Sequence, residues 1–185
     1  MKPASAGHQE FEQLALPLFD SLYNFARWLS KDQTEAEDLV QEAFAKALRG
    51  FSSFTPGTDF RAWMFRISRN TFLTSRTGLQ SKLTVQLDLE EELPVTTTWD
   101  NPETLAIASA TREALQQAIE ALPVSYREVV LLCDVEEMKY AEIAEVLSVP
   151  IGTVMSRLAR GRKLLREALS AERTLTARAK VNDRR

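Results

Sequence analysis

Basic side chains gather in one segment near the C-terminus, where they could neutralise phosphate groups. Between Ser148 and Ser170 there are five arginine or lysine residues and one acid, a net charge of +4 in a chain whose formal total is −3. An apolar stretch, Tyr140–Leu147, precedes them, and Pro150 disfavours helical geometry at the residue before it. This pattern predicts two helices around a tight break, a helix-turn-helix that can enter a major groove. A solvated basic helix in an ordinary bundle is the alternative that these residues leave open.

The second of these predicted helices has two different faces. One face is apolar at helical spacing and is predicted to point inward through Ile151, Val154, Leu158 and Leu165. The other carries the candidate DNA-contacting residues Thr153, Met155, Ser156, Arg157, Arg160 and Lys163. A helix that is apolar on one side and polar and basic on the other has the form of a recognition helix.

A second cluster alternates aromatic residues with arginines between Phe60 and Phe72. The aromatic residues are Phe60, Trp63, Phe65 and Phe72, and the polar ones are Arg61, Arg66, Arg69 and Asn70. Exposed rings could stack on bases while guanidinium groups hold phosphates. A domain core ringed by solvated arginines explains the same residues equally well.

Acidic and amide side chains form a smaller patch on a predicted helix that runs to Leu48. Thr34–Glu37 has the form of a capping box at the start of this helix. Asp38, Gln41 and Glu42 then fall at i, i+3 and i+4, so they share one outward face. Taken alone, such a patch is most often ordinary solvated surface.

The remaining elements are expected to hold these residues in place. In the first half, residues 1–9 are expected to fray, and a long amphipathic helix follows from Phe11, started or kinked at Pro17. In the second half, a helix is predicted over residues 105–122. A second capping box, at residues 125–128, is predicted to open a helix that extends through Cys133.

These patterns predict an all-α fold of two small helical domains joined by a flexible acidic linker, the second domain containing the helix-turn-helix. From Gly78 to Leu105 six acids stand against one lysine, a net charge of −5. Such a linker is not expected to lie on DNA; it would suit a positively charged protein channel or act as a solubilising tether. The predicted segments are a first domain at 10–77, a linker at 78–104, a second domain at 105–170 and a frayed tail at 171–185.

Composition argues against several other classes of protein. The 185 residues are 44% hydrophobic and 26% charged, with one histidine and one cysteine, so no metal-ligand cluster or nucleophile–base pair can be assembled from them. Cys133 lies in an apolar run and is predicted to be a buried thiol. We see no apolar run long enough for a membrane span and no signal peptide, and we expect a cytoplasmic protein without a cofactor, a metal or catalytic activity.

Three motifs in order resemble the extracytoplasmic-function (ECF) sigma factors of bacterial RNA polymerase. Asp38–Phe44 matches the family's clamp-binding segment, and Phe60–Ile67 with Asn70 matches its promoter −10 helix. Leu122–Gly161, which includes PIGTV, matches its −35-reading domain. The likeness covers nearly the whole chain, and the three motifs together are highly specific.

The resemblance assigns a role to each candidate surface. It implies contacts to core polymerase from Asp38, Leu39, Gln41, Glu42 and Phe44. It implies −10 DNA contacts from Phe54, Arg61, Trp63, Arg66, Arg69 and Asn70, with Phe54 and Asn70 forming a pocket for a flipped base. The −35 contacts would be Thr153, Met155, Ser156, Arg157, Arg160 and Lys163. Met155 replaces an arginine expected in some relatives, so the −35 sequence does not follow from these residues.

The implied partners are core RNA polymerase, promoter DNA and a cognate anti-sigma factor, without membrane insertion. The segment PIGTVMSRLARGRK and the Leu16–Pro17 pair resemble the sequences of the branch that responds to thiol oxidation. The anti-sigma proteins of that branch bind zinc. If that likeness holds, the redox sensor is the partner. The alternative function is a stand-alone helix-turn-helix transcriptional regulator, against which the aromatic and arginine-rich helix argues.

Overall fold

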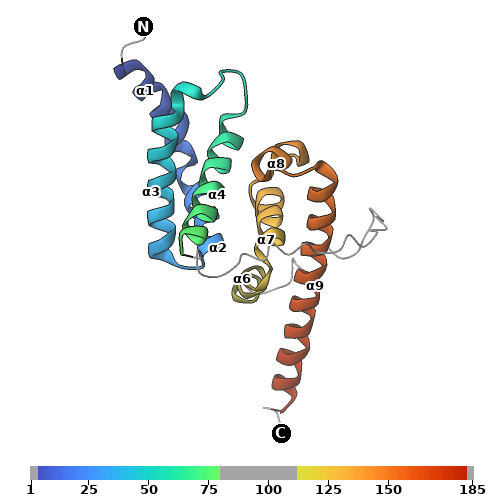
Figure 1. Cartoon of the computed structure of the whole chain (residues 1–185). Coiled ribbons are helices and arrows are strands. Elements are labelled where there is room, and N and C mark those ends of the chain that lie inside the picture. Colours follow the sequence, from blue (N-terminus) through green and yellow to red (C-terminus); the bar gives the residue numbers. More distant parts are fainter. Residues whose placement is uncertain (1–3, 80–111, 183–185) are drawn as a thin grey trace. The chain divides into compact units, whose positions relative to one another are not determined.

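The structure, a computed structural model, describes residues 4–79 and 112–182, and the side chains of residues 7–77 and 112–171 (Figure 1). Every regular element within these ranges is helical, so the all-α prediction is confirmed. Most of the predicted acidic linker, and the first residues of the helix predicted over 105–122, lie outside the described residues.

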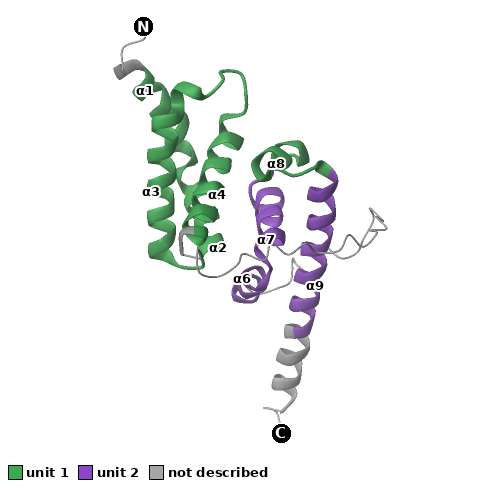
Figure 2. Cartoon of the chain, viewed as in Figure 1, with its two compact units in different colours: residues 1–91, 138–151 green, residues 92–137, 152–185 purple. Residues whose placement is uncertain are grey.

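The chain divides into two compact units (Figure 2). The first unit comprises residues 1–91 together with 138–151, and the second comprises 92–137 together with 152–185. The segment 138–151 is thus grouped with the N-terminal helices, whereas the sequence pattern placed it in a domain spanning 105–170. The domain boundaries stay a prediction.

The first unit is built mainly from three helices that pack on one another, α2 (Phe19–Ser30), α3 (Gln33–Gly50) and α4 (Phe60–Leu79). Its other elements are α1 (Ala4–Ala15), η1 (Leu16–Leu18), η2 (Phe51–Ser53) and α8 (Tyr140–Leu147). Aliphatic and aromatic side chains fill the core, among them Leu22, Phe25, Leu29, Val40, Met64, Phe65 and Phe72. The rings of Phe25 on α2 and Phe65 on α4 meet edge to face, 5.3 Å between centroids.

Helical structure begins earlier than the sequence pattern predicted. Residues 1–9 were expected to fray, but α1 starts at Ala4. Phe11 explains this difference, since its buried ring contacts Phe44 and Phe60 and holds the helix against the unit. The predicted interruption at Pro17 is present as the short 3₁₀ turn η1, because proline cannot donate the backbone hydrogen bond of a continuing α-helix.

The start of α3 is capped by a different residue from the one predicted. The Thr34–Glu37 capping box was wrong: Asp32 is the N-cap, and its carboxylate accepts a hydrogen bond from the backbone N–H of Glu35 at 2.9 Å. An aspartate in extended geometry satisfies one of the unpaired donors in the first turn, so the helix begins at Gln33.

The second unit comprises α6 (Arg112–Ala121), α7 (Val124–Val130), η3 (Leu131–Val135) and the long helix α9 (Ile151–Asn182). Its buried apolar residues come from all four elements, and they include Ala118, Ile119, Val129, Leu132, Val154, Leu158, Leu165 and Leu169. The element η3 is one turn of π-helix, closed by a 2.9 Å hydrogen bond from the backbone N–H of Glu136 to the carbonyl oxygen of Leu131. The α-helix predicted to continue through Cys133 therefore ends at Val130.

A buried arginine, and not a capping box, organises the start of α7. The box predicted at residues 125–128 was wrong, because Pro123 is the N-cap and makes no side-chain cap. Arg127 is only 2% exposed. Its guanidinium group donates to the carbonyl oxygens at the end of α6 and just beyond it, those of Ile119 (3.1 Å), Glu120 (2.8 Å) and Leu122 (2.6 Å). Arg127 thereby caps α6 and joins it to α7.

The break between α8 and α9 has the form that the sequence predicted. α8 ends at Leu147, Ser148 adopts left-handed geometry (φ 56°, ψ 45°), and α9 begins directly after Pro150. Two expectations for α9 were wrong. Ile151 is 48% exposed and not inward-facing, and the helix continues to Asn182, although fraying was predicted from residue 171. Residues 171–182 contain neither glycine nor proline, so nothing in them ends the helix.

Candidate nucleic-acid and polymerase interfaces

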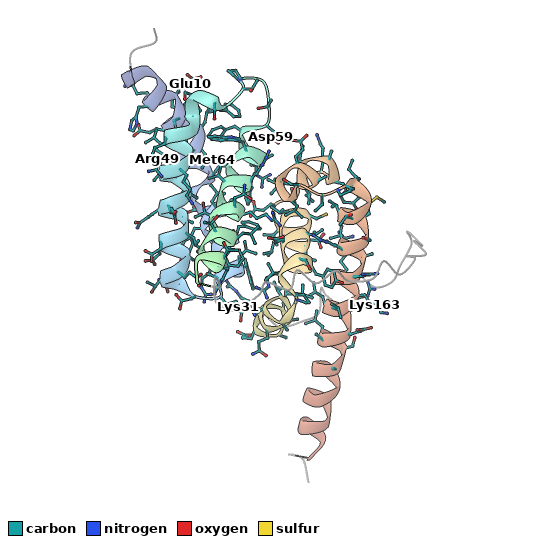
Figure 3. All side chains as sticks on the ribbon, in the orientation of Figure 1. Glu10, Lys31, Arg49, Asp59, Met64 and Lys163 are labelled. Atoms are coloured by element: carbon teal, nitrogen blue, oxygen red, sulfur yellow. The ribbon has the colours of Figure 1, made fainter. Side chains whose placement is uncertain are left out.

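The predicted DNA-contacting residues of α9 do not all share one face. Thr153, Ser156, Arg160 and Lys163 follow one another at spacings of three or four and therefore form one stripe. Lys163, labelled in Figure 3, is exposed, and the other three are half-buried. Arg157 flanks this stripe on one side. Met155 precedes Ser156 by one residue, so it is turned about 100° from Ser156 on the other side.

The opposite face of α9 is closely packed against α7. Val154, Leu158 and Leu165 are at most 3% exposed, as the sequence predicted. Between the last two lies Gly161, where an added Cβ would meet Cγ2 of Val130 at 2.8 Å and the backbone oxygen of Tyr126 at 3.4 Å. A side chain at residue 161 would therefore require Val130 to shift or to be smaller.

One arginine of the basic segment is committed to an ion pair within its own unit. The guanidinium group of Arg162 binds Asp134 of η3 with two nitrogens, Nε to Oδ2 at 3.1 Å and Nη2 to Oδ1. Its Nη2 also lies 3.8 Å from the sulfur of Cys133. The sequence analysis counted Arg162 among the basic residues that could face DNA. In the structure its charge is paired with Asp134, and the pair joins α9 to η3.

An aromatic cluster surrounds the start of α4. Phe54, in the loop before this helix, stacks parallel to Phe51 (6.1 Å between centroids, interplanar angle 6°) and contacts Phe60 (5.2 Å) and Trp63 (5.3 Å). All four rings are half-buried. Asp59, labelled in Figure 3, fixes the helix start, because its carboxylate accepts the backbone N–H groups of Arg61 and Ala62 at 2.9 and 3.2 Å.

The predicted −10 residues of α4 do not all share one face. Trp63, Arg66 and Asn70 stand at i, i+3 and i+7 and form one stripe, in which Arg66 and Asn70 are exposed. Phe54 packs against the first residue of that stripe. Arg61 and Arg69 lie outside this stripe. Arg61 stands two residues before Trp63, on nearly the opposite side of the helix, and its guanidinium group sits 5.6 Å from the centre of the Phe65 ring.

The predicted polymerase-binding residues of α3 also differ in accessibility. Asp38, Gln41 and Glu42 are exposed, and Phe44 is half-buried. Leu39 is only 3% exposed and belongs to the core of the unit, so it supports this surface from behind. The carboxylate of Glu42 forms a 2.8 Å ion pair with Lys46 of the same helix. These residues stand at i and i+4, the spacing at which glutamate and lysine pair on a helix.

The structure describes Cys133 as half-buried, whereas a fully buried thiol was predicted. Burial raises the pKa of its thiol, and the neighbouring carboxylate of Asp134 raises it further. The described side chains contain no group of three or more His, Cys, Asp or Glu that could hold a metal ion. Of the helices in the described ranges, none has the length and apolar character to cross a membrane.

Comparison with known proteins identifies both halves of the chain. The family model "Sigma-70 region 2" matches residues 18–81, and "Sigma-70, region 4" matches residues 112–165. The ECF RNA polymerase sigma factor SigE of Mycolicibacterium smegmatis is 36% identical over 176 residues, which cover 91% of this chain and 68% of the relative. The chain belongs to the ECF sigma factor family.

Two further relatives agree with this assignment. The ECF sigma factor SigW of Bacillus subtilis is 33% identical over 81% of this chain and 83% of the relative. The sigma factor RpoE of Bartonella quintana, solved in complex with the anti-sigma factor NepR, is 28% identical, with a TM-score of 0.67 over 88% of this chain and 98% of that one. The predicted family is therefore confirmed over the stand-alone regulator. The likeness to the thiol-oxidation branch stays a prediction.

Proposed function

We propose that this sigma factor divides promoter recognition among three surfaces. α3 binds core RNA polymerase, and α9 reads the −35 duplex. The melted −10 strand is held by the aromatic cluster around Phe54 and by the stripe of α4 that Trp63, Arg66 and Asn70 form. The chain itself performs no catalysis, because phosphodiester chemistry belongs to the polymerase, and it acts in the cytoplasm where that enzyme works. The linker and domain boundaries predicted from the sequence complete this division of labour.

The observation that carries the proposal is the two-sided character of α9. Its inward face is apolar and at most 3% exposed at Val154, Leu158 and Leu165. Its outward stripe presents Thr153, Ser156 and Arg160, which can donate to base edges, with Lys163 available for phosphate. Met155, turned away from the centre of that stripe, is expected to contribute less than the other predicted −35 residues.

The arrangement at the start of α4 supports single-strand binding. Flipping a base out of the stack costs a few kcal/mol, which an aromatic wall and a hydrogen-bonding amide can offset. Phe54 supplies the wall with Trp63 beside it (5.3 Å), and exposed Asn70 supplies the amide two turns further along α4. Exposed Arg66, between Trp63 and Asn70 on the stripe, suits the phosphate backbone.

The outward face of α3 supports docking to a basic protein surface. Asp38 and Gln41 are exposed, and Phe44 adds a half-buried ring at the edge of the same face. Because Glu42 is already paired with Lys46, we expect Asp38 to contribute more to the attraction.

Control by an anti-sigma factor is the last part of the proposal. The RpoE relative, similar over nearly its whole length, was solved with such a partner. We propose that a comparable protein holds this chain inactive until a stress signal releases it. The raised pKa of Cys133 keeps its thiol protonated, which supports placing any redox sensor in the partner.

Run-off transcription with purified core polymerase on a promoter library tests the proposed function. We expect initiation from a small set of promoters that share both a −10 and a −35 element. Templates in which either element is scrambled should lose most of the signal. Initiation that ignores the −35 sequence would contradict the role of α9, and no initiation at all would contradict the function.

A further inference from the structure

Two consecutive residues fasten α9 to the rest of its unit on the side away from the proposed DNA stripe. The first is Gly161, buried against α7, where a Cβ would come within 2.8 Å of Cγ2 of Val130. Glycine is a poor residue for a helix interior, so its presence at a closely packed position is explained by the approach of the two helices.

The second is Arg162, which pairs with Asp134 through two parallel hydrogen bonds. A fork of this kind fixes orientation as well as distance, because the planar guanidinium group matches the carboxylate only in one plane. Asp134 belongs to the π-turn η3, and such turns insert an extra residue that redirects the following side chains. The pair therefore resists rotation of α9 about its own axis.

These two contacts are adjacent to the residues that would read DNA. Arg160 immediately precedes Gly161 and Lys163 immediately follows Arg162, and both belong to the outward stripe. A helix moves largely as a rigid rod over one turn, so a displacement at residues 161 and 162 moves residues 160 and 163 by a similar amount. Base contacts depend on hydrogen-bond geometry and tolerate little such movement.

We propose that Gly161 and the Arg162–Asp134 pair are positioning residues, which set the depth and the rotation of α9 on α7 and thereby its discrimination among −35 sequences. This inference rests on the proposed function of α9 and adds residues that do not themselves face the DNA. Gly161 sets the depth, and the ion pair sets the rotation.

The depth is tested with Gly161→Ala, Val130→Ala and the double variant, each assayed with core polymerase on promoters with an intact or scrambled −35 element. The readout is the −35 ratio, defined as transcription from the intact promoter divided by transcription from the scrambled one. We expect Gly161→Ala to lower this ratio by about tenfold, which is the effect expected when one base contact is lost. Val130→Ala removes the methyl group that the new Cβ would strike, so the double variant should recover most of the ratio. Affinity for core polymerase should stay unchanged in all three.

A thermal melt of each full-length variant separates positioning from loss of folding. Gly152→Ala serves as the matched control in the melt, because it makes the same change in the same helix with nothing within 4 Å of the new Cβ. Retention of the full −35 ratio by Gly161→Ala would overturn the inference. A reduced ratio that Val130→Ala fails to restore, together with a lowered melting temperature, would also overturn it, because the glycine would then serve folding alone.

The rotation is tested by Arg162→Lys and by exchanging the charges in an Asp134→Arg/Arg162→Asp double variant. Lysine keeps the charge but loses the fork, so we expect a changed order of preference among −35 variants at similar affinity for core polymerase. The exchanged pair should recover part of the original order. An unchanged order in both variants would overturn this role. A wild-type chain that transcribes intact and scrambled −35 templates equally would overturn the proposed function itself, a result distinct from any of these.

Discussion

At the scale of single residues, Arg127 places a charged side chain in the core of the second unit, where its burial must be offset by hydrogen bonds. It is almost wholly buried, and burial lowers the pKa of its guanidinium group, an effect that the carboxylates of Glu120 and Glu128 oppose. A buried charge is tolerated where it is fully hydrogen-bonded, and Arg127 donates to the carbonyl oxygens of Ile119, Glu120 and Leu122.

Arg127→Ala should therefore lower the free energy of unfolding by about 3 kcal/mol, because it leaves buried carbonyl oxygens without a donor and creates a cavity. Urea denaturation of the full chain, followed by circular dichroism, measures the change. The control is Arg112→Ala, which removes an exposed arginine of α6. A loss below about 1 kcal/mol would mean that the cap contributes little.

Arg160→Ala should weaken binding to the −35 element by about 1–3 kcal/mol if the side chain reads a base, and by less if it only contacts phosphate. Transcription from a promoter with a scrambled −35 element is the control, since the substitution should cost nothing further there. Equal losses on both templates would argue against base readout.

Cys133 should react slowly with iodoacetamide near neutral pH, because burial raises its pKa and the thiolate is the reactive form. The folded chain then keeps a proton that the unfolded chain releases near pH 8.5, so this group favours the folded state below that pH and the advantage falls as pH rises above it. Alkylation should be faster in urea than in buffer at pH 8. Equal rates would show that the fold does not protect the thiol.

At the scale of helices, the periodic apolar positions predicted the elements well, and the short-range signals predicted their ends less well. α8 and the start of α9 follow directly from the apolar spacing and from Pro150. The first capping box failed because Asp32, two residues before Thr34, caps α3 instead. The second failed because α7 begins after Pro123, and Arg127 of the predicted box donates to carbonyl oxygens at the end of α6. The close contact of Gly161 with Val130 and the Arg162–Asp134 pair could not be predicted, since each joins residues far apart in the sequence.

The candidate surfaces follow the same division. The resemblance assigned Leu39 and Glu42 to the contact surface of α3, but Leu39 is buried in the core and Glu42 is paired with Lys46, four residues further along the helix. A match to a family motif does not by itself separate side chains that are available for contact from those that are buried or paired. The acidic surface of α3 is therefore narrower than the sequence motif.

Asp38→Arg should weaken binding to core polymerase by about tenfold, as expected when a charge at an interface is reversed. Glu113→Arg, on exposed α6 surface, makes the same change in net charge and is the control. Fluorescence anisotropy of a labelled chain titrated with core polymerase measures both. If the two variants lose affinity equally, the effect is one of overall charge and α3 is not the docking surface.

At the scale of the whole molecule, two small helical regions of one chain are matched by sigma-70 regions 2 and 4. In the proposed function each carries a DNA surface too small for tight binding alone, and the polymerase sets the distance between them. Joining two weak sites at a fixed spacing raises the overall affinity without adding a contact. A stand-alone regulator would not need that help.

The most direct test of this account is a gel shift of a selected promoter duplex with the purified chain, in the presence and absence of core RNA polymerase. We predict feeble binding by the chain alone, and a stable, promoter-specific complex once polymerase is added. Tight, sequence-specific binding without polymerase, or no gain on its addition, would contradict the account.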